Sequence, residues 1–343
     1  MTASRLSLFS LEQVFKKVKL EELSLTLNAE LRGEAYFNCQ NVASISHPRR
    51  DSITVIKNIN NLSDEILENA GAILTTFDLA SSIKLQTNLL LVKDIDTAFI
   101  KLLNIFKYQS SIPKLTPVLN NLSKGKSSLF LGENVTIGDN FSYGANVVIQ
   151  DNVSIGNDVH IGSNVVICYG TIIGNNVQID HGCIIGSEGF GNVQDSTSTW
   201  RHLPHLGNVV IKDFCSLGAN CCIDRGTIDD TIINKSVIID NLVHIAHNVI
   251  VGENTAIAAK VGIAGSCIIG KRNKIGGMVG IIDHITTADD VTISATSTVT
   301  KNLSEAGIYT GILPISKHFT WKRNASWFLK LDKMFKYLNF RKK

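Results

Sequence analysis

The sequence lacks the cysteine patterns of zinc-ribbon and disulfide-rich proteins. Its seven cysteines are odd in number, contain no pair in CxxC spacing and mostly stand among apolar residues. This usage favours reduced thiols in a cytoplasmic protein over a disulfide framework. The cysteines are Cys39, Cys168, Cys183, Cys215, Cys221, Cys222 and Cys267.

Long apolar runs and strong net charge are also missing. No run of about 18 apolar residues occurs, so no membrane-spanning helix is expected. Residues 1–20 mix three lysines with scattered apolar residues and contain no uninterrupted apolar segment, which argues against a signal peptide. The formal net charge of +3 is too small to indicate nucleic-acid binding. With 44% apolar and 18% charged residues, the composition is that of an ordinary globular protein.

The first third of the chain does not repeat. Residues 1–108 alternate short apolar runs, such as 52–56 and 72–76, with helical spacing at 95–106, which predicts a small α/β domain. Residues 109–128 hold two of the five prolines with clustered Ser, Asn and Lys, and we interpret them as a linker that could include a degenerate first repeat.

Residues 129–312 place an apolar residue at every sixth position. Such a period is neither helical nor that of a simple strand, and it predicts a parallel β-helix with 18 residues per coil. The repeat breaks at 187–208, which must leave the β-helix as a loop, and long loops on rigid scaffolds often bind ligands. The first ten positions are Leu131, Ile137, Tyr143, Ile149, Ile155, Ile161, Ile167, Ile173, Ile179 and Ile185.

Residues 313–343 are predicted to form a basic amphipathic helix. Nine Lys and Arg residues accompany one acid, Asp332, and Trp and Phe recur at helical spacing. An oligomerisation helix with a solvated basic face is one interpretation. A docking site for an acidic partner, or at most peripheral contact with an anionic membrane, is the other.

The outward direction of His247 is the main chemical signal in the repeat. Ile245 occupies an inward position, so His247, two residues later, lies outside the β-helix. The alternatives without a catalytic role are a histidine packed in the core and an ordinary surface histidine. An exposed histidine on a rigid wall is suited to act as a general base near neutral pH.

A metal site is a weaker interpretation of the histidines, and we expect none. His244 and His247 are three residues apart, and His284 lies two coils and one residue beyond His247. Zinc hydratases that resemble gamma carbonic anhydrases use two histidines five apart and a third from a neighbouring subunit. That pair does not occur here.

The chain resembles the UDP-3-O-(3-hydroxyacyl)glucosamine N-acyltransferases of lipid A biosynthesis. The resemblance covers essentially the whole chain and implies a mainly β fold: a left-handed parallel β-helix with an N-terminal α/β domain and a C-terminal α-helix. Four motifs carry it: Gly189-Phe190-Gly191, Ile223-Asp224-Arg225-Gly226, the run from Ile239 to Val249 containing Asn241-Leu242-Val243-His244-Ile245-Ala246-His247-Asn248, and Ala264-Gly265-Ser266.

The resemblance implies transfer of a 3-hydroxyacyl group from acyl carrier protein to the 2-amino group of a UDP-linked, 3-O-acylated glucosamine. His247 matches the general base, the backbone N–H of Gly265 matches the oxyanion donor, and His284 matches an assisting histidine. Asp240 and Asn241, on the same wall, are expected to contact sugar or carrier arm, or only to shape a corner of the β-helix. No cofactor of its own is expected, because the acyl group travels on the phosphopantetheine of the carrier.

Several positions depart from the family. Its N-terminal domain stacks uracil between a Phe and a Tyr that flank an Asn; here Asn58 matches, but Val55 and Asn61 replace the aromatics. Aromatic stacking is worth about 1–3 kcal/mol per base, so we expect nucleotide binding that is weaker or differently arranged. His244 stands where the family usually has Gln. Thr296 and Thr298 stand where bulkier Met residues can cap the acyl groove, which suggests a longer acyl chain.

The resemblance also implies a homotrimer, in which the wall carrying His247 faces a neighbour's wall. Two rival functions remain at this stage: another hexapeptide acyltransferase that makes an ester or uses acetyl-CoA, and a non-catalytic β-helix scaffold. The long N-terminal domain argues against the first. The joint presence of His247, Gly265 and His284 argues against the second.

Overall fold

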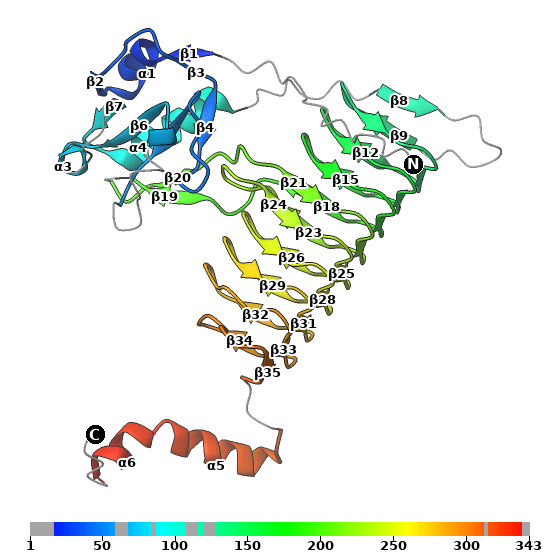
Figure 1. Ribbon diagram of the computed structural model, residues 1–343. Helices are drawn as coiled ribbons and strands as arrows, with labels where there is room; N and C mark the ends of the chain where they lie inside the picture. Colours follow the sequence, from blue (N-terminus) through cyan, green and yellow to red (C-terminus); the bar gives the residue numbers. More distant parts are fainter. Residues whose placement is uncertain are drawn as a thin grey trace, which may run out of the picture.

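The computed structural model describes residues 17–58, 68–81, 83, 87–107, 116–119, 128–195, 197–311 and 315–337. A parallel β-helix forms most of the molecule, as Figure 1 shows. The predicted mainly β fold with hexapeptide repeats is therefore confirmed. No helix among these residues is long and apolar enough to cross a membrane.

Three parallel sheets form the walls of the β-helix. Neighbouring strands pair residues eighteen positions apart, as Thr136 pairs with Ser154, so each coil stacks in register on the one before. In the described part of the chain, the seven-stranded sheet contains β10 (Thr136–Ile137), β13 (Ser154–Ile155), β16 (Ile172–Ile173), β21 (Val209–Ile211), β24 (Thr231–Ile233), β27 (Ile250–Val251) and β30 (Ile268–Ile269).

The second wall is a nine-stranded sheet, again counted over the described residues. It contains β11 (Ser142–Tyr143), β14 (His160–Ile161), β17 (Gln178–Ile179), β22 (Ser216–Leu217), β25 (Ile238–Ile239), β28 (Ala256–Ile257), β31 (Lys274–Ile275), β33 (Val291–Ile293) and β35 (Gly307–Tyr309). Its inward residues, such as Ile239 and Ile257, are buried in one continuous core.

The third wall is a ten-stranded sheet within the same described ranges. Its first strand, β8, pairs antiparallel with β9 and lies inside the stretch interpreted as a linker. The sheet contains β8 (Thr116–Leu119), β9 (Ser128–Leu131), β12 (Val147–Ile149), β15 (Val166–Ile167), β18 (Ile184–Ser187), β23 (Cys222–Asp224), β26 (His244–Ile245), β29 (Gly262–Ile263), β32 (Gly280–Ile281) and β34 (Thr298–Val299).

The corners between walls contain residues in the left-handed backbone region. Asn134, Asn140 and Asn146 have φ values of 55° to 57°. Asn tolerates this conformation better than most residues, which explains its recurrence at every sixth position in the early coils. His284 takes the same conformation, with φ of 58°, in a later coil.

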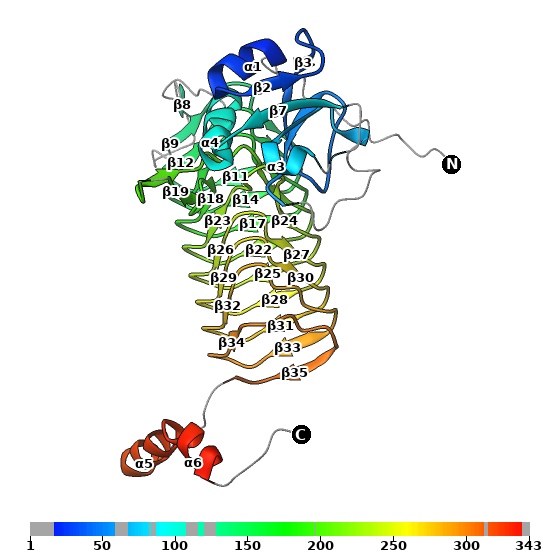
Figure 2. The same cartoon turned by 90° about the vertical axis from the view of Figure 1, so that its left-hand side faces the viewer.

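The insertion at 187–208 leaves the wall between β18 and β21 and forms a hairpin of β19 (Asn192–Gln194) and β20 (Trp200–His202). A second, shorter insertion lies at 226–230. Here Asn208 and its hydrogen-bond partner Asp230 are 22 residues apart, whereas neighbouring coils of the regular repeat are eighteen residues apart. Figures 1 and 2 place the hairpin against the N-terminal domain. Both breaks in the repeat therefore lie on the same side of the β-helix.

The N-terminal domain is a five-stranded sheet with helices. Its apolar core packs against Leu203, Leu206 and Ile228 of the two breaks. The sheet runs β2 (Glu30–Arg32), β7 (Asn88–Val92), β6 (Ala72–Thr76), β5 (Ser52–Val55) and β4 (Asn41–Ala43), with α1 (Leu20–Leu27), α3 (Phe77–Ala80) and α4 (Ile95–Phe106), while β1 (Val18–Lys19) pairs with β3 (Asn38–Cys39). The two breaks thus join the domain to the β-helix.

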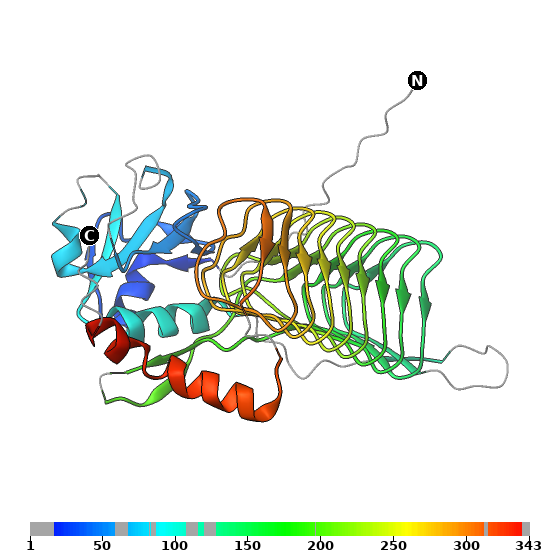
Figure 3. The same cartoon turned by 90° about the horizontal axis from the view of Figure 1, so that it is seen from below.

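The C-terminal segment forms two helices, α5 (His318–Phe328) and α6 (Leu331–Tyr337), where the sequence predicted one. Both lie beyond the last coil (Figures 1 and 2), and the view from below in Figure 3 shows them mostly outside the outline of the coils. No residue of α5 is buried, and Phe319, Phe328 and Leu329 are largely exposed. The apolar face therefore has no partner within the described part of this chain.

Candidate active site

His247 occupies the corner that follows β26, and Gly265 occupies the equivalent corner one coil further on. The carbonyl of His247 accepts a hydrogen bond from the N–H of Ser266 at 2.9 Å. The carbonyl of Gly265 accepts one from the N–H of His284 at 3.0 Å. The three residues named from the sequence as catalytic therefore lie on successive coils, with backbone hydrogen bonds between His247 and Ser266 and between Gly265 and His284.

Asn248 defines which ring nitrogen of His247 carries the proton. The Asn248 side-chain oxygen accepts the N–H of Thr227 at 3.0 Å, and its amide nitrogen donates to the carbonyl of Asp229 at 2.8 Å. The oxygen, lying 3.1 Å from His247 Nδ1, must therefore accept from the ring. This leaves Nε2 of the neutral imidazole as the proton acceptor.

Gly265 lies directly against the imidazole of His247. A Cβ at this position would come within 2.6 Å of Cε1 and 2.7 Å of Nε2, so any other residue would force the ring of His247 to move. The ring therefore occupies the volume that any other residue at 265 would fill. This close approach explains why glycine follows His247 by one coil.

The backbone N–H of Gly265 has no hydrogen-bond partner among the described residues. At comparable corners, the N–H donates to a side chain one coil further on, as Ala145 does to Ser163 at 3.0 Å and Lys271 does to Asp289 at 2.7 Å. Asp283 lies one coil beyond Gly265 and makes no such bond in the described structure. An N–H that makes no hydrogen bond within the described residues can donate to an oxyanion during acyl transfer.

His205, in the insertion, packs edge-on against His247 with ring centroids 5.3 Å apart. It is 1% exposed, and its Nδ1 donates to the carbonyl of Leu203 at 3.0 Å. Nε2 is buried without a partner in the described part of the chain. Burial, with a smaller contribution from neighbouring His247, lowers the pKa of His205 to about 4. His205 therefore stays neutral and limits the space around the His247 ring.

The sequence did not single out His205, because the insertion follows no repeat. Its only signal was its place in a loop expected to bind ligands. Gly189, from the same insertion, covers another side of His247: a Cβ on Gly189 would lie 3.2 Å from Cβ of His247 and 3.3 Å from a carboxylate oxygen of Asp224.

Asp224 is a buried carboxylate close to both histidines of this wall. Its oxygens accept from Ser187 Oγ at 2.9 Å and lie 3.6 Å from His244 Nε2. Burial raises the pKa of Asp224, while the hydrogen bond from Ser187 and the charges of His244 and His247 oppose that shift. Together with Cys222, Asp224 and His244 bring three atoms suited to metal coordination within 4.8 Å of one another.

Asp240 and Asn241 occupy the corner before β26, so this strand separates them from His247. Asp240 accepts from the N–H of Asn241 at 2.7 Å, and Asn241 accepts from the N–H of Ala219 at 2.7 Å. Both side chains therefore shape the corner. Asn58 lies exposed after β5, and Val55, in β5, is half-buried against the core of the N-terminal domain. Asn61 lies outside the described residues.

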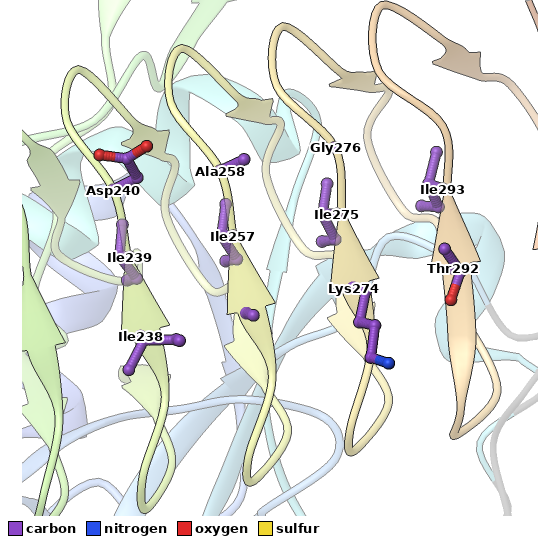
Figure 4. A pocket seen from close by; sticks show the side chains of 11 residues that line it. Ile238, Ile239, Asp240, Ile257, Ala258, Lys274, Ile275, Gly276, Thr292 and Ile293 are labelled. Atoms are coloured by element: carbon purple, nitrogen blue, oxygen red, sulfur yellow. The ribbon is translucent and has the colours of Figure 1, made fainter.

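A groove of about 550 Å³ runs along a different wall, the nine-stranded sheet (Figure 4). Ile238 of β25, Asp240 of the corner that follows it, Lys274 of β31 and Thr292 of β33 are among the residues that line it. His247 and Gly265 do not contribute to it. We therefore base the candidate site on the chemistry at His247 and not on this groove.

Comparison with known proteins agrees with the repeat and the motifs. The family model for bacterial transferase hexapeptide (six repeats) matches residues 131–168. The UDP-3-O-acylglucosamine N-acyltransferase of Idiomarina loihiensis is 51% identical over 150 residues, which are 44% of this chain and 44% of that protein. The enzyme of the same name from Bordetella pertussis is 42% identical over 143 residues, 41% of this chain and 39% of the relative.

The chain resembles the UDP-3-O-acylglucosamine N-acyltransferases. The relative from Delftia acidovorans is 36% identical over 148 residues, 43% of this chain and 44% of that protein. In each case the match spans less than half of the relative's length. Among solved structures, a UDP-N-acetylglucosamine acyltransferase from Campylobacter jejuni has a TM-score of 0.47 at 21% identity, covering 63% of this chain and 84% of that one.

Proposed function

We propose that the chain is an N-acyltransferase that moves a 3-hydroxyacyl group from acyl carrier protein to the 2-amino group of UDP-3-O-(3-hydroxyacyl)glucosamine. One observation carries the proposal: the imidazole of His247, whose Nδ1 faces the side-chain oxygen of Asn248, lies directly against Gly265, whose N–H has no hydrogen-bond partner among the described residues. General base and oxyanion donor are the two groups that amide formation from a thioester needs.

The proposed reaction begins with attack of the neutral sugar amine on the thioester carbonyl. Nε2 of His247 takes the proton that the amine loses as the carbon–nitrogen bond forms. The N–H of Gly265 donates to the oxyanion of the tetrahedral intermediate. When the intermediate collapses, the carbon–sulfur bond breaks, and the imidazolium returns the proton to the departing thiolate. His284, bonded through its N–H to Gly265, assists near the thioester arm.

The sugar nucleotide is proposed to reach His247 from the N-terminal domain. Asn58 and Val55 lie on that domain, whose core packs against Leu203 and Leu206 of the insertion. The insertion also carries Glu188, which pairs with Lys107 at 2.6 Å at the end of α4. These contacts support one composite binding surface that joins the uridine end of the substrate to the amine.

A homotrimer and a docked carrier protein complete the proposal. Large exposed apolar side chains on the walls and on the C-terminal helices support burial against other chains. The basic residues of 317–336 support docking of an acidic carrier protein. The exposed apolar side chains include Ile184, Ile238, Leu242, Ile268, Met278, Phe319, Trp327 and Phe328.

The test is direct transfer with purified components. The full-length chain is incubated with 3-hydroxyacyl carrier protein and UDP-3-O-acylglucosamine, and mass spectrometry detects the amide. We expect amide from the wild type and almost none from His247→Ala. An ester product would favour another hexapeptide acyltransferase, wild-type inactivity would favour a scaffold, and full activity in His247→Ala would refute the role of this base.

A further inference from the structure

Cys222, Asp224 and His244 form a cluster that acyl transfer does not require. Cys222 Sγ lies 3.7 Å from an oxygen of Asp224, and His244 Nε2 lies 3.6 Å from the other oxygen. All three donor atoms lie within 4.8 Å of one another. Thiolate, imidazole and carboxylate in one cluster are the ligands that zinc prefers.

The backbone holds the cluster rigidly. Cys222 in β23 and His244 in β26 are register partners on adjacent coils, so their side chains leave the same face of the sheet side by side. Asp224 is buried at 5% exposure and fixed by Ser187 Oγ at 2.9 Å. Such a scaffold has lost most of its conformational freedom before any ion binds, which favours affinity.

The observed separations are close to those of a coordinated ion. With metal–ligand bonds of about 2.0–2.3 Å, donors around tetrahedral zinc are about 3.3–3.8 Å apart. Two of the contacts already fall in that range, and side-chain rotation of exposed His244 can shorten the third. Ser187 Oγ, 3.7 Å from Cys222 Sγ, or a water molecule can fill a fourth position.

We propose that Cys222, Asp224 and His244 bind a divalent ion of intermediate softness, Zn²⁺ in the first place. The sequence predicted no metal, on the ground that the histidine pair of zinc hydratases is missing. The cluster combines side chains from adjacent coils, which a search along the chain for histidine spacing does not find. It also assigns a role to His244, which the family resemblance did not explain.

The location of the ion would connect it with the candidate active site. Gly189 lies against both His247 and Asp224, with Cβ approaches of 3.2 and 3.3 Å. An ion on Asp224 therefore occupies the same surface as the proposed base. We infer that zinc binding inhibits acyl transfer, and that Cys222→Ser and His244→Gln, which weaken zinc binding, weaken this inhibition as well. This consequence depends on the proposed function, whereas zinc binding itself does not.

The experiment measures Zn²⁺ binding to the full-length chain by competition with a chromophoric chelator, and Co²⁺ binding by its thiolate charge-transfer absorption. We expect one ion per chain with micromolar or tighter affinity. Cys222→Ser and His244→Gln should each weaken binding at least about tenfold, as loss of a ligand or its support typically does, and Cys222→Ser should abolish the thiolate band.

Two control variants keep the test specific. Cys39→Ser removes a buried thiol of β3 in the N-terminal domain, and His181→Gln removes a His–Asp pair in which His181 Nε2 lies 3.3 Å from Asp180. Both should bind zinc as the wild type does. Absence of stoichiometric binding, or equal binding in all four variants, would overturn the metal site. Wild-type transfer activity without added zinc is measured separately, so failure of the proposed function is recognised independently.

Discussion

Asn248 orients His247: its side-chain oxygen accepts the Nδ1 proton at 3.1 Å, while the Thr227 N–H and the Asp229 carbonyl hold the amide in place. The proposed base and its orienting group are therefore consecutive residues of one corner. The residues that fix Asn248 come from the short insertion at 226–230. The break in the repeat thus positions the chemistry.

Replacing Asn248 with Ala should reduce kcat by about 10- to 100-fold with a smaller effect on KM. The imidazole would lose the partner that selects its tautomer, which is a condition for general-base catalysis. Steady-state kinetics of acyl transfer measure this effect. Asn254→Ala is the matched control, because Asn254 has nearly the same backbone conformation, with φ of 58° against 60°, at a corner without a histidine. An equal loss of kcat in both variants would show that the effect comes from disturbing the backbone at a corner and not from losing the hydrogen bond to His247.

Gly265→Ala should lower transfer activity by about 100-fold, the typical cost of misplacing a catalytic group by about 1 Å. The added methyl group would come within 2.6 Å of the His247 ring and push it away. Gly277→Ala is the control, because a Cβ at Gly277 would come no closer than 3.3 Å to another atom, the carbonyl oxygen of Ala259, and Gly277 lies at a corner outside the wall of His247. Kinetics and thermal unfolding of both variants test the idea. Normal activity in Gly265→Ala would mean that His247 reacts from another position.

The six-residue period predicts both the β-helix and the outward direction of His247, because each residue's place in a coil follows from its number. The spacing of eighteen between His247 and Gly265 equals the register between neighbouring strands, so their contact also follows from the sequence. His205 and Asn248 are different. Their positions depend on residues of the two breaks, whose course is decided by packing against the N-terminal domain and not by the repeat.

His205 should make the folded state sensitive to acid. Its pKa is about 4 in the fold against 6.5 for an ordinary histidine, so the unfolded chain binds its proton at a higher pH than the folded one. Its contribution to stability is therefore complete above about pH 6.5 and is lost progressively as the pH falls towards 4. The loss amounts to about 2–3 kcal/mol.

Urea unfolding at pH 7.5, 5.5 and 4.5 measures this loss for the wild type and for His205→Gln, which cannot titrate in this range. The variant should lose about 2–3 kcal/mol less stability than the wild type between pH 7.5 and pH 4.5. His160→Gln, which removes an exposed histidine on β14, is the control. If the free energy of unfolding depended on pH in the same way for the wild type and His205→Gln, His205 would titrate in the folded state as it does in the unfolded chain, and the prediction would be wrong.

The outer face of the ten-stranded sheet provides room for an acyl chain beyond the candidate active site. Gly262, Gly280 and Thr298 are register partners on successive coils, and a Cβ on either glycine would meet open space. If the acyl chain lies along this column, the side chain at 298 limits its length. Thr298→Met should then shift the preference towards shorter chains, because the larger side chain closes the end of the column.

Competition between carrier proteins loaded with acyl chains of different length measures the preference. We expect Thr298→Met to lower kcat/KM for the longest chain by about 10- to 100-fold, since one or two misplaced methylenes are worth about 1–3 kcal/mol, while the shortest chain reacts as before. Thr136→Met, an exposed threonine on the seven-stranded sheet in the first coils, is the matched control. An unchanged preference in Thr298→Met would place the acyl chain on another wall of the β-helix, with the groove beside β25, β28, β31 and β33 as the next candidate.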